Sequence, residues 1–198
     1  MNFQDTQLIG VLARAESTVS SLSSLLGGLV EKFAARGYSL YLVGGSVRDA
    51  LLGRLGNDLD FTTPARPEVV KEILDEWAET VWDTGIDFGT VSAAYKGQQI
   101  EITTFRSDSY DGQSRNPEVV YGDTLEGDLV RRDFKANAMA IELLADASFK
   151  FHDPLHGLHD IADRVLDTPD KPEISFHDDP LRICLLYTSP SPRDVEES

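Results

Sequence analysis

The chain has 198 residues, 34 of them acidic and 18 basic, and a formal net charge of −16 at pH 7. This charge repels phosphate over most of the surface, so any binding to nucleic acid must come from a local basic patch or from a part outside this chain. No apolar run reaches the ~18–20 residues that span a membrane, and the single cysteine, Cys184, excludes an internal disulfide. We therefore expect a cytoplasmic protein with one well-buried domain, or one domain plus a small appendage.

The first elements, in chain order, are a lead-in, a helix and a strand. Residues 1–16 show no clear period and are expected to form a loose lead-in. A helical face then follows before Gly37, a residue type typical of a helix C-terminus, and consists of Leu22, Leu25, Leu29, Val30 and Phe33. Residues 38–45 read as a buried strand, and 46–53 read as a short helix that Ser46 is able to cap.

The middle and end of the chain continue this alternation. Strands are predicted at 58–63 and 80–84, a helix at 67–80 begins with Pro67, and residues 89–105 form a hairpin. After a long polar loop, a helix, further strands and a short helix follow up to residue 168. The pattern predicts an α+β domain, a small mixed β-sheet flanked by helices.

Residues 41–63, YLVGGSVRDALLGRLGNDLDFTT, combine a glycine turn with two nearby carboxylates. Asp58 and Asp60 point to the same face of a strand, where their repulsion of roughly 3 kcal/mol favours a divalent cation such as Mg²⁺. Gly44 and Gly45 allow close backbone approach at a helix N-terminus, which can hold phosphate, and Arg48 either contacts phosphate or pairs with an aspartate. Each motif alone is more often a solvated strand end or a tight turn, but together they indicate phosphoryl or nucleotidyl transfer.

A third carboxylate lies on the predicted hairpin. Glu101 stands between Ile100 and Ile102, so it faces the opposite side of its strand from both isoleucines. A solvated face of an edge strand explains this pattern equally well. If the face instead adjoins Asp58 and Asp60, three acidic groups would suit a two-metal site.

The segment EGDLVRRDFKANAMA is polar where its apolar spacing still predicts a helix. Arg131 and Arg132 would then lie about 100° apart, so one can reach a triphosphate while the other pairs with a carboxylate such as Asp133. Asn137 is suited to a ribose hydroxyl. The alternative is an ordinary cluster of surface salt bridges.

The segment HDDPLRI places Asp179 and Arg182 three residues apart, on one face of an expected helix. A carboxylate beside a guanidinium complements an amino group next to a ring acceptor, which cytosine and adenine present and guanine and uracil do not. An i, i+3 salt bridge is the alternative interpretation.

The ordered motifs LVGGSVRDALLG…NDLDFTT, IEITTFR, GDLVRRDFKANAMA, DPLHGLHDI and DDPLRI resemble those of class II tRNA nucleotidyltransferases, from about residue 39 to 183. These CCA-adding enzymes are close relatives of bacterial poly(A) polymerases. The resemblance implies that Asp58 and Asp60 are metal-binding catalytic residues and that Glu101 is the third acid. It also implies nucleotide-binding roles for Gly44, Gly45, Arg48, Arg131, Arg132, Asp133 and Asn137, and an amino-acid template formed by Asp179 and Arg182.

The resemblance further implies a division of the chain. Residues 1–168 would form the nucleotidyltransferase head domain, and 169–183 would begin a helical neck. In this family the neck, body and tail domains hold most of the tRNA. The loop 106–123, with Arg115, would correspond to a flexible segment that helps the switch from C to A addition. Residues 184–198 resemble a translated sequencing adapter and are expected to be a non-native tail.

Three functions follow as hypotheses. The first is template-independent addition of C, C and A to the 3′ end of tRNA from CTP and ATP, with Mg²⁺ as cofactor and pyrophosphate as product. The second is a poly(A) polymerase that adds AMP to RNA 3′ ends. The third, from another class, is an inactive fragment that binds only metal and nucleotide.

Overall fold

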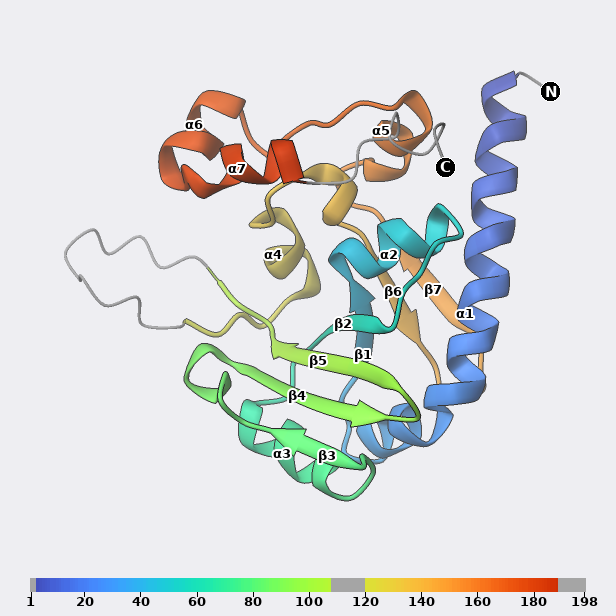
Figure 1. Cartoon of the computed structure of the whole chain (residues 1–198), viewed down its shortest axis with the longest axis vertical. Helices are drawn as coiled ribbons and strands as arrows, with labels where there is room; N and C mark the ends of the chain where they lie inside the picture. Colours follow the sequence, from blue (N-terminus) through green and yellow to red (C-terminus); the bar gives the residue numbers. More distant parts are fainter. Residues whose placement is uncertain (1–2, 108–119, 189–198) are drawn as a thin grey trace.

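The computed structural model describes residues 3–107 and 120–188, which form one mixed sheet flanked by helices (Figure 1). The elements are α1 Phe3–Ala35, β1 Leu40–Val43, α2 Gly44–Leu51, β2 Asp58–Thr63, α3 Pro67–Asp75, β3 Thr80–Trp82, η1 Ile86–Phe88, β4 Thr90–Tyr95, β5 Gln98–Thr104, α4 Leu125–Val130, η2 Lys135–Asn137, β6 Ala140–Leu143, β7 Phe149–His152, α5 Gly157–Asp163, α6 Pro172–Asp178 and α7 Leu181–Thr188. This architecture confirms the predicted α+β fold. No helix in the described part of the chain is long and apolar enough to cross a membrane.

The seven strands have the order β3-β4-β5-β2-β1-β6-β7. The central strand β2 pairs in parallel with β5 and antiparallel with β1, whereas all other neighbours are antiparallel. Because β2 and β5 are parallel and in register, residues opposite each other on these strands point to the same face. This pairing decides which side chains of the two strands can meet.

The long helix α1 packs against α2, α3 and α5 along one side of the sheet (Figure 1). The prediction of a loose lead-in over residues 1–16 was wrong, because α1 begins at Phe3. Its early turns continue the buried stripe with Val11, Ala15 and Val19, which are at most 7% exposed. Small side chains at four-residue spacing among polar neighbours produce a weak amphipathic pattern, and tertiary packing stabilises the helix instead.

Helix α2 begins directly after β1, at Gly44, whose φ of +65° favours glycine. Ser46 was expected to cap this helix, but α2 has no side-chain cap and Ser46 lies inside its first turn, with its side chain turned to β2. The observed bounds of other elements differ from the predicted ones by a few residues. Helix α3, for example, ends at Asp75 rather than at residue 80.

The last described elements, α6 and α7, lie beyond the sheet on the side of α4 (Figure 1). Helix α7 runs through Cys184 to Thr188, and the remainder of the expected tail lies outside the described residues. The same holds for Arg115 and for most of the expected flexible loop. The division into head, neck and non-native tail stays a prediction.

Candidate functional site

The acidic side chains gather on one face of the central strands. Asp58 and Asp60 lie on the exposed face of β2, while Leu59 between them is buried on the other face. Glu101, also exposed, lies directly opposite Asp60 on β5. The parallel register thus brings the third predicted carboxylate beside the first two, as the sequence hypothesis of a shared face required.

The electrostatic environment of Asp60 reflects this crowding. Asp60 keeps access to solvent at the edge of a cleft, but burial by the surrounding protein raises the pKa of its carboxyl. Glu101 raises the pKa further, Arg132 lowers it, and Asp58 adds a smaller rise. The negative charges therefore oppose one another, and a bound cation would relieve that repulsion.

The carboxylates of Asp58 and Asp60 suit a cation whose coordination shell is completed by water and by the substrate. In residues 3–107 and 120–188, no three His, Cys, Asp or Glu side chains are arranged to hold a metal ion by themselves. Mg²⁺ is commonly bound by one or two carboxylates together with water and substrate phosphates. Asp58 and Asp60 fit that requirement, whereas a cage built wholly from protein ligands is absent from the described residues.

A cleft of about 420 Å³ opens in front of Asp60 and Glu101, whereas Asp58 is not one of its lining residues. Its walls combine the acidic face with an opposing group of arginines and with the start of the last helices. The lining residues are Val43, Asp60, Phe61, Glu101, Thr103, Arg106, Asp128, Arg131, Arg132, Asp133, Asp179, Arg182 and Leu185. Seven predicted site residues are therefore brought together in one cavity, namely Asp60, Glu101, Arg131, Arg132, Asp133, Asp179 and Arg182.

Arg106, Arg131 and Arg132 form one wall of the cleft, which we call the arginine wall. A buried carboxylate, Asp128, which is 4% exposed, holds two of these residues in place. Its Oδ2 accepts from Nη2 of Arg132 at 3.0 Å, and its Oδ1 accepts from the backbone N–H of Arg106 at 3.1 Å. Arg131 and Arg132 were expected on a helix, but α4 ends at Val130, so both belong to the turn that follows. An anion in the cleft would meet this positive wall.

Arg106 is a cleft residue that the sequence interpretation missed. Burial lowers the pKa of its guanidinium, and the nearby cations Arg131 and Arg132 lower it further, while Asp128 opposes them. Its Nη2 donates to Oγ1 of Thr90 at 3.3 Å, but its buried Nε has no hydrogen-bond partner in the described part of the chain. The available signal was an arginine placed directly after the strand that carries Glu101.

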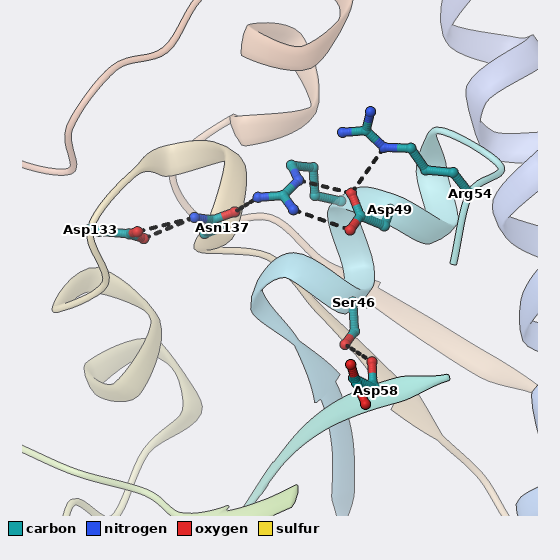
Figure 2. Close-up of polar contacts among 7 residues, drawn as sticks. Ser46, Asp49, Arg54, Asp58, Asp133 and Asn137 are labelled. Atoms are coloured by element: carbon teal, nitrogen blue, oxygen red, sulfur yellow. Dashed lines mark hydrogen bonds and ion pairs between the residues drawn. The ribbon is translucent and has the colours of Figure 1, made fainter. Parts of the chain in front are cut away.

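A chain of hydrogen bonds links α2 to the cleft (Figure 2). Nη1 of Arg48 donates to Oδ1 of Asn137 at 2.9 Å, and Nδ2 of Asn137 donates to Oδ1 of Asp133 at 3.0 Å. Arg48 also pairs with both carboxylate oxygens of Asp49, at 3.0 and 3.1 Å. Arg48 thus pairs with an aspartate, one of the two roles considered for it, while its contact with phosphate stays a prediction. Asn137 bridges Arg48 and Asp133 and does not line the cleft.

The two glycines adjoin this arginine system. A Cβ on Gly44 would lie 3.0 Å from Nη1 of Arg132, and one on Gly45 would lie 3.3 Å from Nη2 of Arg48. Their immediate effect is to let guanidinium groups approach the turn between β1 and α2. The expected contact of these glycines with phosphate stays a prediction.

Asp179 and Arg182 lie at the far end of the cleft. They were expected on one helix face, but Asp179 is in extended conformation between α6 and α7, and only Arg182 is helical. Nη1 of Arg182 donates to Oγ of Ser175 at 2.7 Å, and its Nη2 donates to the backbone oxygen of Arg131 at 3.0 Å. The Asp179 carboxylate is 3.8 Å from Nε of Arg182, a loose ion pair.

The chain matches the family described as "Poly A polymerase head domain" over residues 40–167. It belongs to this family. The head-domain match covers all seven strands of the sheet, from Leu40 at the start of β1, together with α2 to α5. Asp179 and Arg182 follow the matched region.

Curated relatives and solved structures point the same way. The chain is 41% identical over 156 residues to a CCA-adding enzyme of Listeria innocua, covering 78% of this chain and 38% of the relative. It is 41% identical over 164 residues to a CCA-adding enzyme of Lactobacillus helveticus, covering 81% of this chain and 39% of the relative. The chain thus spans about two fifths of the length of these relatives.

Two solved structures resemble this head domain closely. One is a Bacillus stearothermophilus CCA-adding enzyme in complex with CTP, with a TM-score of 0.67 and 36% identity over 81% of this chain and 37% of that one. The other is a tRNA nucleotidyltransferase complexed with a primer tRNA and an incoming ATP analog, with a TM-score of 0.64 and 31% identity over 78% of this chain and 42% of that one.

Proposed function

We propose that this head domain transfers nucleotidyl groups from CTP and ATP to the 3′ end of tRNA, which completes the CCA terminus and releases pyrophosphate. The observation that carries the proposal is the cleft in which Asp60 and Glu101 face a wall of arginines. Such a site accommodates a cation and a triphosphate side by side. The relatives that are CCA-adding enzymes favour this activity over poly(A) synthesis.

In this proposal Asp58 and Asp60 hold divalent metal, which we take to be Mg²⁺, with Glu101 as the neighbouring acid. Bound metal would lower the pKa of the attacking 3′-hydroxyl and stabilise charge on the leaving pyrophosphate. Arg131 and Arg132 contribute positive charge toward the triphosphate, and Arg106 adds to that field from the cleft wall. Asp133, fixed through Asn137 and Arg48, stands beside them.

Base selection is assigned to Asp179 and Arg182, which line the same cleft. Their carboxylate and guanidinium complement the amino group and ring acceptor that cytosine and adenine share. The pair is loose here, at 3.8 Å, so a base would have to come between or beside the two groups. A cytoplasmic location and tRNA binding mainly through helical domains outside this chain complete the proposal.

The test uses tRNA that lacks its 3′ CCA, Mg²⁺, and labelled CTP and ATP, supplied separately and together. The wild-type chain and the corresponding full-length gene product are compared, each with an Asp58→Ala control. Addition of two C and one A that disappears in the control is the expected result. A long A tail without use of CTP would favour the poly(A) alternative. Activity in the full-length protein alone would favour the third hypothesis, that this chain is an inactive fragment.

A further inference from the structure

Among the described strands, none pairs with one edge of β2 where Asp58 and Asp60 lie. Asn57 and Thr63 direct their carbonyls to β5, accepting from Gln99 at 2.8 Å and from Phe105 at 2.9 Å. The backbone N–H and C=O groups of successive residues in a strand point to opposite edges. The even-numbered residues of β2, Asp58 and Asp60 among them, therefore direct these groups to the edge away from β5. There β1 pairs only at Phe61 and Thr62, which leaves the main chain at Asp58 and Asp60 uncovered by β1.

The side chain of Ser46 takes the place of the missing strand. The backbone N–H of Asp60 donates to Oγ of Ser46 at 2.9 Å. The Ser46 hydroxyl donates to the Asp58 carbonyl at a longer 3.4 Å (Figure 2). A serine hydroxyl both donates and accepts, so one side chain satisfies both groups. Ser46 is 5% exposed, which shields these hydrogen bonds from competing water.

We propose that Ser46 is a positioning residue, which fixes the backbone of β2 so that the carboxylates of Asp58 and Asp60 face a cation together. The proposal rests on the metal-binding part of the proposed function. A rotation of this two-residue unit would turn one carboxylate away from the shared face. The Ser46 hydroxyl contacts the Asp58 carbonyl and the Asp60 N–H of β2. The proposed role therefore does not require direct contact of this hydroxyl with phosphate.

The first test examines the backbone without metal. Amide hydrogen exchange of the metal-free chain is followed by NMR for the wild type, Ser46→Ala and Ser46→Thr. Loss of the acceptor should speed exchange at the Asp60 amide by roughly five- to tenfold, about the effect of one hydrogen bond. Threonine keeps the hydroxyl and should preserve slow exchange. The matched control is Ser20→Ala, because Ser20 is exposed and its hydroxyl donates to the Glu16 carbonyl within α1, away from β2.

The second test measures the cation itself. Mn²⁺ binding in the presence of CTP is titrated by electron paramagnetic resonance for the same variants. Residues that support metal ligands typically alter affinity by 10–100-fold, so Ser46→Ala should weaken Mn²⁺ binding by at least about tenfold. Ser46→Thr and Ser20→Ala should bind Mn²⁺ as the wild type does.

The outcomes separate this inference from the proposed function. Faster exchange at Asp60 together with weaker Mn²⁺ binding supports the positioning role. Unchanged exchange in Ser46→Ala, or unchanged Mn²⁺ affinity with a raised dissociation constant for CTP, would overturn it and assign the hydroxyl to the nucleotide. If the wild type does not bind Mn²⁺, the metal-binding part of the proposed function is overturned as well. The same holds if Asp58→Ala binds Mn²⁺ as tightly as the wild type does.

Discussion

Asp128 offers the sharpest test of how the arginine wall is held. Its carboxylate is 4% exposed and joins Arg132 and the backbone of Arg106 through hydrogen bonds of 3.0 and 3.1 Å. Asp128→Ala would remove the negative charge and leave both donors without their partner. Among the described residues the buried Nε of Arg132 has no hydrogen-bond partner, so loss of Asp128 would leave a second donor of this guanidinium unpaired.

The magnitude follows from burial. Breaking a buried ion pair by removing one partner costs about 3–5 kcal/mol. Arg132 keeps 24% of its side chain exposed, so water can reach part of the freed guanidinium, and we expect the lower end, about 3 kcal/mol. Asp128→Asn retains an acceptor for Arg106 and should lose less, about 1–3 kcal/mol.

Urea unfolding, followed by circular dichroism, measures both variants against the wild type. With a slope of about 2 kcal/mol per molar, a loss of ~3 kcal/mol lowers the midpoint by ~1.5 M. Asp163→Ala, an exposed carboxylate on α5, serves as the control and should change stability by less than about 0.5 kcal/mol. If Asp128→Ala unfolds with the midpoint of that control, the carboxylate does not hold the wall as described.

Three further predictions concern the remaining contacts. Gly157→Ala should destabilise the fold by about 3 kcal/mol or more in the same unfolding assay, because the added Cβ would lie 2.1 Å from the Lys135 carbonyl oxygen. Gly56→Ala is the control and should leave stability nearly unchanged, because its added Cβ would meet no other described residue within 4 Å beyond its chain neighbours. Asp60→Asn should raise the melting temperature at neutral pH, because folding raises the pKa of this carboxyl and so disfavours its ionised form. That gain should vanish below pH 3.8, where the wild-type residue is protonated in both states, and a gain independent of pH would contradict the reasoning. Asn137→Ala should weaken CTP binding by roughly tenfold in calorimetry, through loss of hydrogen bonds to charged groups, and unaltered binding would show that the bridge is dispensable.

Much of the fold could be predicted from local sequence. The strands at 58–63 and 98–104 show clear alternation or β-rich composition between turn residues, and both form as expected. Errors arose where packing overrides a weak local signal. The first turns of α1 carry alanine and valine rather than leucine on their buried face, so only their burial against the domain reveals the stripe.

The candidate site was predicted in composition more than in geometry. Asp58, Asp60 and Glu101 were chosen for alternation along strands, a local property. Asp179 and Arg182 were placed on one helix by their spacing, but the chain is extended at Asp179 and α7 begins after it. Arg106 and Asp128 escaped notice because their importance depends on burial and on partners distant in the chain.

The sequence by itself determined which chemistry is available, because the identity and spacing of carboxylates, arginines and glycines are local facts. Only the tertiary structure decided which of them meet. The parallel register of β2 and β5 places Asp60 beside Glu101, although they are 41 positions apart in the sequence. The end of α4 and the buried Asp128 set the arginines across the cleft, and the uncovered edge of β2 gives Ser46 its place. Strand pairing and burial are cooperative properties of the whole chain, so spacing alone does not specify them.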